Sequence, residues 1–327
     1  MIRKANNNDK TNVLSLLNDV FKKQQRSKNV LRDDRFWVWK YKSSPFGESL
    51  IHVAEDNNKI IASATLWSWE IFYNGNFYKC YQPCDTVVSG AARGKGFFYK
   101  INNERIIDAK KENTDFIFNF PNENSLPGYK KCGWTFVGKI PWKLKILKPL
   151  TFINSYFKKS QSEKIRVPRK FSLNHKNLQA IPYKSTPNNN KICTNISPDY
   201  VKWRYLAHPT RDYGIINVES QKKIVGSVIF TLSKKGNMVE MVLTEFICEN
   251  SYDKKLIKKV IKSAREMGVT FIALMSKQTK SFNTFWQIGF LDIKNKNLVC
   301  RPLNSETEKF CLDIKNWSFS AGMHDSI

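Results

Sequence analysis

The chain has 327 residues and a formal net charge of +26, and 41% of its residues are hydrophobic and 13% aromatic. This length favours two domains, and the composition supplies enough apolar surface for two buried cores. The charge indicates anionic partners: coenzyme A phosphates, nucleotide sugars, nucleic acid or an anionic membrane surface. Codon bias toward lysine and asparagine accounts for part of the excess.

Cysteine spacing and apolar runs exclude several classes of protein. The seven cysteines form no C-x-x-C pair and have no histidine cluster beside them, so we expect neither a zinc site nor a disulfide framework. The first residues lack the apolar core of a signal peptide, and no run approaches the ~18 apolar residues of a membrane span. The sequence therefore predicts a cytoplasmic protein without a bound metal.

The chain begins with a short predicted strand, residues 1–5, and a helix that ends near Phe21. Alternating residues then predict strands at 50–54 and 60–69 and a hairpin at 72–81. Between helix and strands lies a block of aromatic residues, which is either a stacking platform for a sugar or base, or the core of the helix–strand junction. The block contains Phe36, Trp37, Trp39, Tyr41 and Phe46.

Next come a strand at 85–89, a basic turn with Gly94 and Gly96, and a helical pattern from Phe97 to about Lys111. Backbone N–H groups of such a turn converge on one point, and the helix N-terminus adds partial positive charge there. Glycine allows phosphate oxygens to approach without a Cβ in the way. The stretch therefore predicts a pyrophosphate site, although neither a P-loop nor a dinucleotide fingerprint is present.

The turn resembles the coenzyme A pyrophosphate loop of the GNAT acyltransferase superfamily, [RQ]-x-x-G-x-[GA]. Arg93 and the two glycines fit, whereas Phe98 stands where Gly or Ala is usual. After a strand at 115–120, Tyr129 lies in the pattern Tyr-x-x-x-Gly-Trp, which is the second signature of the superfamily. The aromatic and Phe-Pro-Asn segments are similar to those of GNAT proteins of bacterial surface-polysaccharide synthesis, and the likeness covers residues 1–145.

An internal repeat extends the resemblance to the second half. Trp203-Arg-Tyr205 repeats Trp39-Lys-Tyr41 at a shift of 164 residues, and 223–227 repeats 59–63 at the same shift. The equivalent of the glycine-rich turn, 248–254, contains no glycine, and Phe285 replaces the tyrosine. We therefore expect an α/β (α+β) protein with two GNAT-like domains in tandem, each a mixed, mostly antiparallel sheet flanked by helices, of which the second is degenerate.

The expected boundaries are a catalytic acyl-CoA-binding domain at 1–145, a basic linker at 146–190 and the degenerate domain at 191–327. Residues 142–170 carry nine lysines and arginines against one glutamate. They form either a patch for a membrane surface or a solvated linker.

The resemblance implies an N-acetyltransferase that uses acetyl-CoA as cosubstrate and no metal. Tyr129 would be the general acid, or else a packed tyrosine, and Asp85 would be the base, an acceptor-binding group or a plain strand-end carboxylate. The strand before the loop would splay and pair with the pantetheine arm. The cofactor-binding residues would be Thr86, Val87, Val88, Arg93, Gly94, Lys95, Gly96, Phe97, Phe98 and Asn124. Asn124 could equally be a loop cap, and His52 on its strand is a weaker candidate for catalysis.

The expected acceptor is a small amine, plausibly a nucleotide-linked amino sugar for surface polysaccharide, acylated directly without a covalent cysteine intermediate. Two alternatives stay open: a Fem-type aminoacyl transferase that uses charged tRNA, and a non-enzymatic docking module. Nucleic acid is not expected as a partner in the main hypothesis, and oligomeric state, acyl chain length and base are open.

Overall fold

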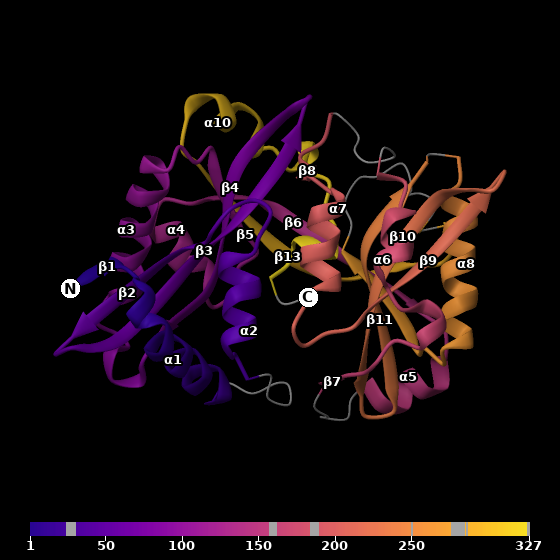
Figure 1. The fold of residues 1–327 in the computed structure, drawn as a ribbon, viewed down its shortest axis with the longest axis horizontal. Helices are drawn as coiled ribbons and strands as arrows, with labels where there is room; N and C mark the ends of the chain where they lie inside the picture. The colour runs from indigo at the N-terminus through magenta and orange to yellow at the C-terminus, as the bar shows by residue number, and fades with distance from the viewer. Residues whose placement is uncertain are drawn as a thin grey trace. The chain divides into compact units, whose positions relative to one another are not determined.

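The computed structural model describes residues 1–23, 31–156, 162–183, 190–249, 251–275, 285 and 287–325 (Figure 1). It divides into two compact units, which we describe separately. The first contains residues 1–25, 29–139 and 297–316, and the second contains 26–28, 140–296 and 317–327.

The first unit is built on a mixed sheet in the order β1-β2-β3-β4-β5-β13. Neighbouring strands run antiparallel except β4 and β5, which are parallel and are joined through helix α3. The strands are β1 Ile2–Lys4, β2 Leu50–Asp56, β3 Lys59–Tyr73, β4 Asn76–Val88, β5 Phe116–Asn119 and, from β13 Leu291–Pro302, the part from Asn297 onward.

Helices cover both faces of this sheet. Adjacent residues of a strand point to opposite faces. Leu66 packs in one cluster with Ile106 of α3, whereas Trp67 contacts Trp39 before β2, so α3 and the aromatic block lie on opposite faces. The helical elements are η1 Asn7–Asp9, α1 Lys10–Lys23, α2 Asp34–Trp37, η2 Val38–Lys42, η3 Gly90–Ala92, α3 Phe97–Lys111, α4 Leu126–Lys131, α10 Ser305–Cys311 and η7 Ile314–Asn316.

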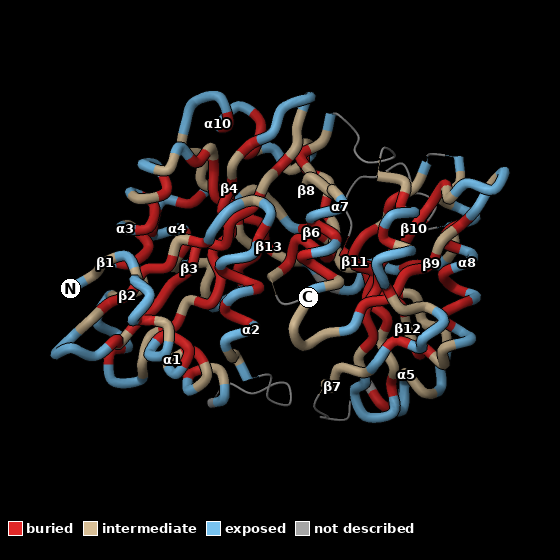
Figure 2. Tube along the Cα trace, viewed as in Figure 1, coloured by how far each residue is buried: buried red, intermediate tan, exposed pale blue. Residues whose placement is uncertain are grey.

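The aromatic block is core. Trp39 and Tyr41 are buried, Tyr41 completely, and Trp67 and Trp69 of β3 are fully buried beside them (Figure 2). Of the two interpretations open at the sequence level, the structure therefore supports the packing role, because rings without exposed surface offer no stacking platform.

The second unit repeats the arrangement of the first. Its sheet runs β6-β12-β11-β10, with β9 and β7 both paired to β10, and β11 and β12 are the parallel pair, joined through α8. The strands are the part of β6 Thr135–Ile146 from Ile140 onward, β7 Ser162–Lys164, β8 Cys193–Thr194, β9 Tyr213–Ser220, β10 Lys223–Lys235, β11 Met238–Cys248 and β12 Phe271–Met275.

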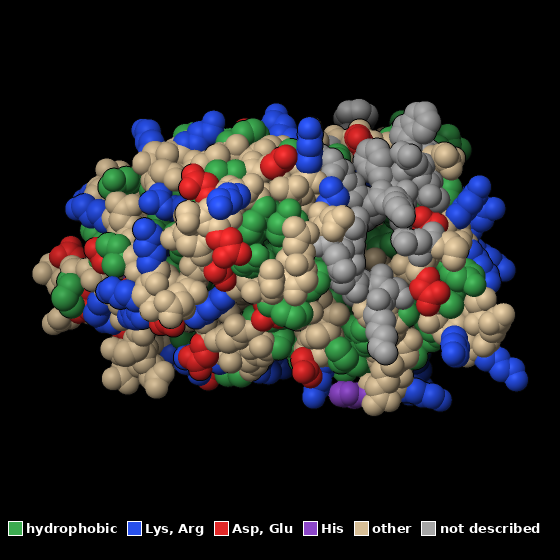
Figure 3. Space-filling view, turned by 90° about the horizontal axis from the view of Figure 1, so that it is seen from above, with side chains coloured by type: hydrophobic (Ala, Val, Ile, Leu, Met, Phe, Trp, Pro, Cys, Tyr) green, Lys and Arg blue, Asp and Glu red, His purple; other side chains and the backbone are tan. Residues whose placement is uncertain are grey.

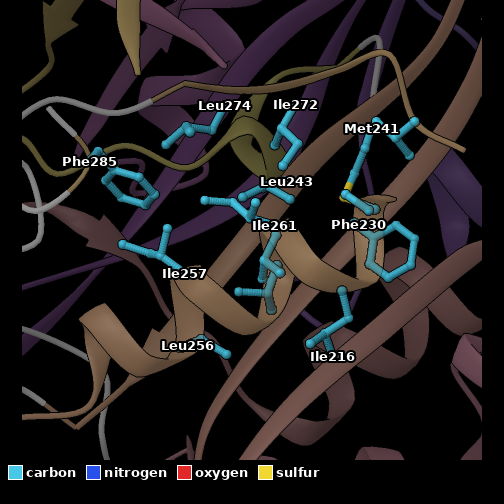
Figure 4. Close-up of a cluster of buried hydrophobic side chains, with 14 of the residues drawn as sticks. Ile216, Phe230, Met241, Leu243, Leu256, Ile257, Ile261, Ile272, Leu274 and Phe285 are labelled. Carbon is cyan, nitrogen blue, oxygen red and sulfur yellow. The ribbon is translucent and has the colours of Figure 1, made fainter. Parts of the chain in front are cut away.

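Helix α8, Asp253–Glu266, buries one apolar face against this sheet (Figure 4). Leu256, Ile257 and Ile261 of α8 pack against side chains of β10, β11 and β12 and against Phe285. Spacings of one, four and five residues place these three side chains on one stripe of the helix, which is what a helix covering a sheet requires. The other helical elements are α5 Pro149–Tyr156, η4 Arg169–Phe171, α6 His175–Gln179, α7 Pro198–Val201, η6 Lys202–Leu206 and η8 Ala321–Met323.

The mixed, mostly antiparallel sheet flanked by helices that the sequence predicts is confirmed. The boundary between the two units falls after residue 139 rather than at 145. The described part of 146–190 forms α5, β7, η4 and α6 within the second unit, and 297–316 returns to the first. The lysines of the basic stretch are partly used internally: Lys143 is buried and paired with Asp292 at 2.5 Å. Lysine and arginine side chains are spread over the face in Figure 3 rather than gathered at one place.

Candidate active site

The glycine-rich turn lies where the sequence places it, between β4 and α3. Gly94 and Gly96 have φ of +79° and +75°, a region that side chains with a Cβ rarely adopt, and a Cβ at either position would meet no atom within 4 Å. Arg93 to Gly96 are all exposed. The first N–H groups of α3 have no acceptor within the helix, and they face outward with two cationic side chains beside them. The turn is thus open and suited to an anion.

The strand before the turn separates from its parallel neighbour. β4 pairs with β5 only at Cys80–Phe116 and Tyr81–Ile117, although β4 continues to Val88. On its other edge, β5 pairs with β13 over its whole length, from Phe116 to Asn119. The ladder between β4 and β5 therefore ends at Tyr81, whereas β4 itself runs on to Val88. This is the separation of strands that the superfamily resemblance implies for pantetheine binding.

Thr86, Val87 and Val88 lie on this separated part of β4, after a bulge at which the β3–β4 register shifts. Val87 is buried, whereas Thr86 and Val88 are partly exposed. Thr86 points to the α3 face, since its hydroxyl contacts Arg105 of that helix. The segment thus presents two partly exposed side chains along the gap.

Tyr129 lies on α4, on the same face of the sheet as α3. Its side chain is 4% exposed, and its ring packs edge-on against Phe98 at 5.6 Å and against Trp134 at 5.0 Å between ring centroids. Packing on both sides gives the phenol one orientation, which a proton donor needs. The tyrosine is therefore both packed and compatible with a role as acid.

Phe98, the departure from the loop pattern, fills the space between α3 and α4. A Cβ at Gly128 would lie 2.9 Å from the Phe98 ring, so the glycine of α4 accommodates this phenylalanine. Phe97, its neighbour on the first turn of α3, is half-buried, and Asn124 is exposed in the turn before α4. The structure thus brings the loop, Phe98 and Tyr129 together and leaves Asn124 at the rim.

Asp85 is buried at the bulge, on the opposite face from Thr86. Its carboxylate lies 2.6 Å from Lys40 Nζ, 2.9 Å from the Tyr41 hydroxyl and 3.4 Å from Arg32. Burial alone would raise the pKa of Asp85, but Lys40 and Arg32 outweigh burial and hold that pKa well below its usual range. A carboxylate held by two cations is a weak proton acceptor, so the geometry favours a structural role over that of general base.

The second unit contains a related cluster, in which the tyrosine and the cation recur at the repeat shift of 164 residues but the buried acid does not. Tyr205, the equivalent of Tyr41, donates to Glu245 at 2.5 Å, and Arg204 stands where Lys40 does. Arg204 donates to the backbone carbonyls of Gly322 and His324. Both aromatic segments are π-helical, at Val38–Lys42 and Lys202–Leu206. Because a buried acid also accepts a hydrogen bond from the equivalent tyrosine in a unit without a glycine-rich turn, such a cluster belongs to the fold rather than to the chemistry of the loop.

His52 of β2 is fixed under α3. Its Nε2 lies 2.9 Å from Asp108 Oδ2, and the side chain is 1% exposed. Burial lowers the pKa of the imidazole, although Asp108 acts in the opposite direction. The residue links α3 to β2, so its geometry favours a structural role over a catalytic one.

Sequence reasoning missed Arg105 and Asn102 of α3. Both are completely buried, and Asn102 Oδ1 accepts hydrogen bonds from Arg105 Nε at 3.0 Å and Nη2 at 2.7 Å. The signal was present, because Arg105 falls on the apolar stripe that includes Ile101 and Ile106, where a cation is unexpected.

The equivalent region of the second unit lacks the features that suit an anion. β11 pairs with β12 only from Glu240 to Leu243 and continues to Cys248, so the strands also separate there. The turn that follows is acidic, and Phe285 is buried among Phe246 and Phe290. This region therefore has separated strands but neither a basic glycine turn nor a tyrosine at the position of Phe285.

Comparison with known families identifies the class of the first unit. Residues 1–137 match the family model of the acetyltransferase (GNAT) domain. The matched stretch includes the separated end of β4, the basic turn and Tyr129, so residues 1–137 are similar to a GNAT acetyltransferase domain and the chain is an acyltransferase. No curated protein sequence matches the chain.

Solved structures share the fold over nearly the whole chain. A GCN5-related N-acetyltransferase from Anabaena variabilis is similar with a TM-score of 0.65 and 12% identity, over 93% of this chain and 73% of that one. A probable N-acyltransferase from Enterococcus faecalis gives a TM-score of 0.66 and 13% identity, over 93% and 72%. N-myristoyltransferase from Saccharomyces cerevisiae with bound myristoyl-CoA is similar with a TM-score of 0.59 and 11% identity, over 91% of this chain and 82% of that one.

Within the described ranges, no three His, Cys, Asp or Glu side chains come together as a metal site. In the same ranges, no helix has both the length and the apolar content to cross a bilayer.

Proposed function

We propose that the first unit transfers an acetyl group from acetyl-CoA directly to an amine. The observation that carries the proposal is the combination of an open basic turn at the N-terminus of α3 with the end of β4, Thr86 to Val88, which lies beyond the last β4–β5 pair. Arg93, Lys95 and the N–H groups around Gly96 would hold the pyrophosphate. The edge of Thr86 to Val88 would pair with the pantetheine amides, which need a donor and an acceptor each.

The chemistry then needs a polarised carbonyl and a protonated leaving group. An N–H of the Thr86–Val88 segment would polarise the thioester carbonyl, and Tyr129 would give its proton to the departing sulfur. Asp85 is better assigned to the support of β4, because its charge is already neutralised by Lys40. We assign no residue as the base. The amine proton would pass to water or to another group of the acceptor.

The second unit is, in this proposal, a degenerate GNAT-like domain that shapes the acceptor site or stabilises the pair. The repeated element order, the π-helical segments and the Glu245 cluster support a common origin with the first unit. The acceptor we favour is an amino sugar carried on a nucleotide, which rests on the resemblance to polysaccharide-associated GNAT proteins. Contact with a membrane surface through 142–170 and a cytoplasmic location belong to the same hypothesis.

Calorimetric titration with acetyl-CoA tests the proposal, beside a variant carrying Arg93→Glu and Gly96→Asp. Binding near 1:1 that the variant loses is expected, and a ligand at ~100 times its Kd should stabilise the protein by about 2.7 kcal/mol. Binding at 2:1 would contradict the degenerate second unit. Because the yeast neighbour binds myristoyl-CoA, the titration is repeated with longer acyl-CoAs.

A second candidate is a Fem-type aminoacyl transferase, which the high positive charge favours. Absence of acetyl-CoA binding together with tight binding of charged tRNA would support that candidate over the acetyltransferase. Release of free coenzyme A on addition of amino-sugar nucleotides would support the acetyltransferase.

A further inference from the structure

Arg105 of α3 is a completely buried cation without an acidic partner in the described part of the chain. Its exposed fraction is 0%, and its hydrogen bonds go to two neutral groups: Asn102 Oδ1, and the Thr86 hydroxyl at 3.4 Å from Nη1. A guanidinium has five N–H donors in a planar fork, and these bonds use three of them. The positive charge of Arg105 is therefore uncompensated by these contacts, and two of its N–H donors are not used by them.

The other buried ionisable groups of the first unit behave differently. Asp9 is paired with Arg3 at 2.6 Å, Lys40 with Asp85 at 2.6 Å and His52 with Asp108 at 2.9 Å. Burying an ion is costly unless an opposite charge or a full set of hydrogen bonds compensates it. Unlike these groups, Arg105 is buried without a group of opposite charge beside it in the described residues.

The guanidinium lies at the gap between the separated strands. Thr86, which it contacts, belongs to the separated part of β4, on the α3 face. Cys132 at the end of α4 lies within reach of the same charge: burial raises the pKa of this thiol, and Arg105 acts against that rise. A positive charge is thus held between β4, α3 and α4, where the coenzyme A arm is proposed to enter.

We infer that the positive charge of Arg105, acting from behind the Thr86 hydroxyl, stabilises the thiolate of coenzyme A that leaves during transfer. This inference rests on the proposed coenzyme A site. When the amine attacks the thioester carbon, the new C–N bond forms and the C–S bond breaks, and the electron pair of that bond moves to sulfur. Arg105 compensates the negative charge, Tyr129 then supplies its proton to the sulfur, and the proton lost by the amine passes through water back to the Tyr129 phenolate.

The groups around Arg105 stay in one state over the range in which the thiol titrates. Burial lowers the pKa of His52 below its ordinary 6.5 and raises the pKa of Cys132 above its ordinary 9.0, while hydrogen bonds from His52 and Lys111 outweigh burial and lower the pKa of Asp108. A change in coenzyme A affinity between pH 6.5 and 9 therefore reports on the ligand. Desulfo-coenzyme A is the matched control ligand, because it carries the same phosphates as coenzyme A and lacks the sulfur.

The test is calorimetric binding of coenzyme A and desulfo-coenzyme A to the full chain at several pH values. Each unit by which the site lowers the pKa of the bound thiol, about 8.5 in water, should tighten coenzyme A by up to about tenfold between pH 6.5 and 9. Desulfo-coenzyme A should show no such gain. Equal pH profiles for the two ligands would overturn the inference without any variant, whereas failure of both to bind would overturn the coenzyme A site itself.

Variants then assign the effect. Arg105→Met should bind desulfo-coenzyme A as the native chain does and lose the tightening of coenzyme A at high pH, and Arg105→Lys should keep part of it. In Tyr129→Phe the tightening should persist, because the phenol supplies a proton rather than a charge. A folded Arg105→Met protein that retains the full pH effect, or that loses both ligands equally, contradicts the assignment.

Discussion

Lys40 Nζ lies 2.6 Å from Asp85 Oδ2 in the first unit, and both side chains are 4% exposed. The pair connects the π-helical segment before β2 to the bulge in β4, from which the separated strand continues. Support of the strand by a buried ion pair explains how Asp85 adopts a φ of +45° next to the proposed thioester site.

Asp85→Asn should destabilise the protein by about 3–5 kcal/mol, because Lys40 is left buried without its counter-charge. Chemical denaturation measures the change. The matched control is the double variant Lys40→Met, Asp85→Asn, which removes both charges and should recover much of the loss. If Asp85→Asn is as stable as the native chain yet inactive, Asp85 is the base after all.

The same pair predicts acid sensitivity. Since the folded pKa of Asp85 is depressed, its stabilisation is present above the ordinary carboxyl pKa, about 3.9, and is lost as the pH falls toward the folded pKa. The stability difference between the native chain and Asp85→Asn should therefore shrink below about pH 4. A difference that stays constant down to pH 2 would contradict the ion pair.

His52 predicts a second pH dependence, at higher pH. The pKa of this imidazole is lower in the folded protein than in the unfolded chain. As the pH drops below about 6.5, protons therefore bind the unfolded chain preferentially, and the stability of the fold should decrease. His52→Gln removes the titrating group while it keeps a donor for Asp108. The slope of stability against pH between 5 and 6.5 should be smaller in this variant, and an unchanged slope assigns the dependence to other groups.

Gly96→Ala should weaken acetyl-CoA binding at a modest cost in stability. A Cβ there meets no atom within 4 Å, so the cost comes from the φ of +75° alone, about 1–2 kcal/mol. Gly90→Ala is the control, since Gly90 has open space around it and no positive φ. Similar affinities in the two variants would show that the turn does not contact the ligand.

Tyr129→Phe should leave the fold intact and slow the transfer. The ring contacts with Phe98 and Trp134 are kept, and loss of an acid typically lowers the rate 10²–10⁴-fold. Rate and acetyl-CoA affinity are measured together, and Tyr99→Phe on the exposed side of α3 is the control. A native rate in Tyr129→Phe assigns the tyrosine to packing only.

The sequence by itself determined the local features. The turn at Gly94 and Gly96, the strand before it, the helix after it and Tyr129 all follow from short-range patterns, because backbone conformation and helix spacing depend on neighbours in the chain. The 164-residue repeat likewise predicted that Trp39 and Tyr41 serve the fold.

Only the tertiary structure decided what the charges do. Asp85 resembled a base until Lys40, 45 residues earlier in sequence, was found beside it, and the hydrogen bonds of Arg105 to Asn102 and Thr86 appeared only in the fold. The return of 297–316 to the first unit could not be predicted either, since the pairing of β13 with β5 joins residues about 180 positions apart. Burial and pairing depend on which distant segments meet, and that is a property of packing rather than of local sequence.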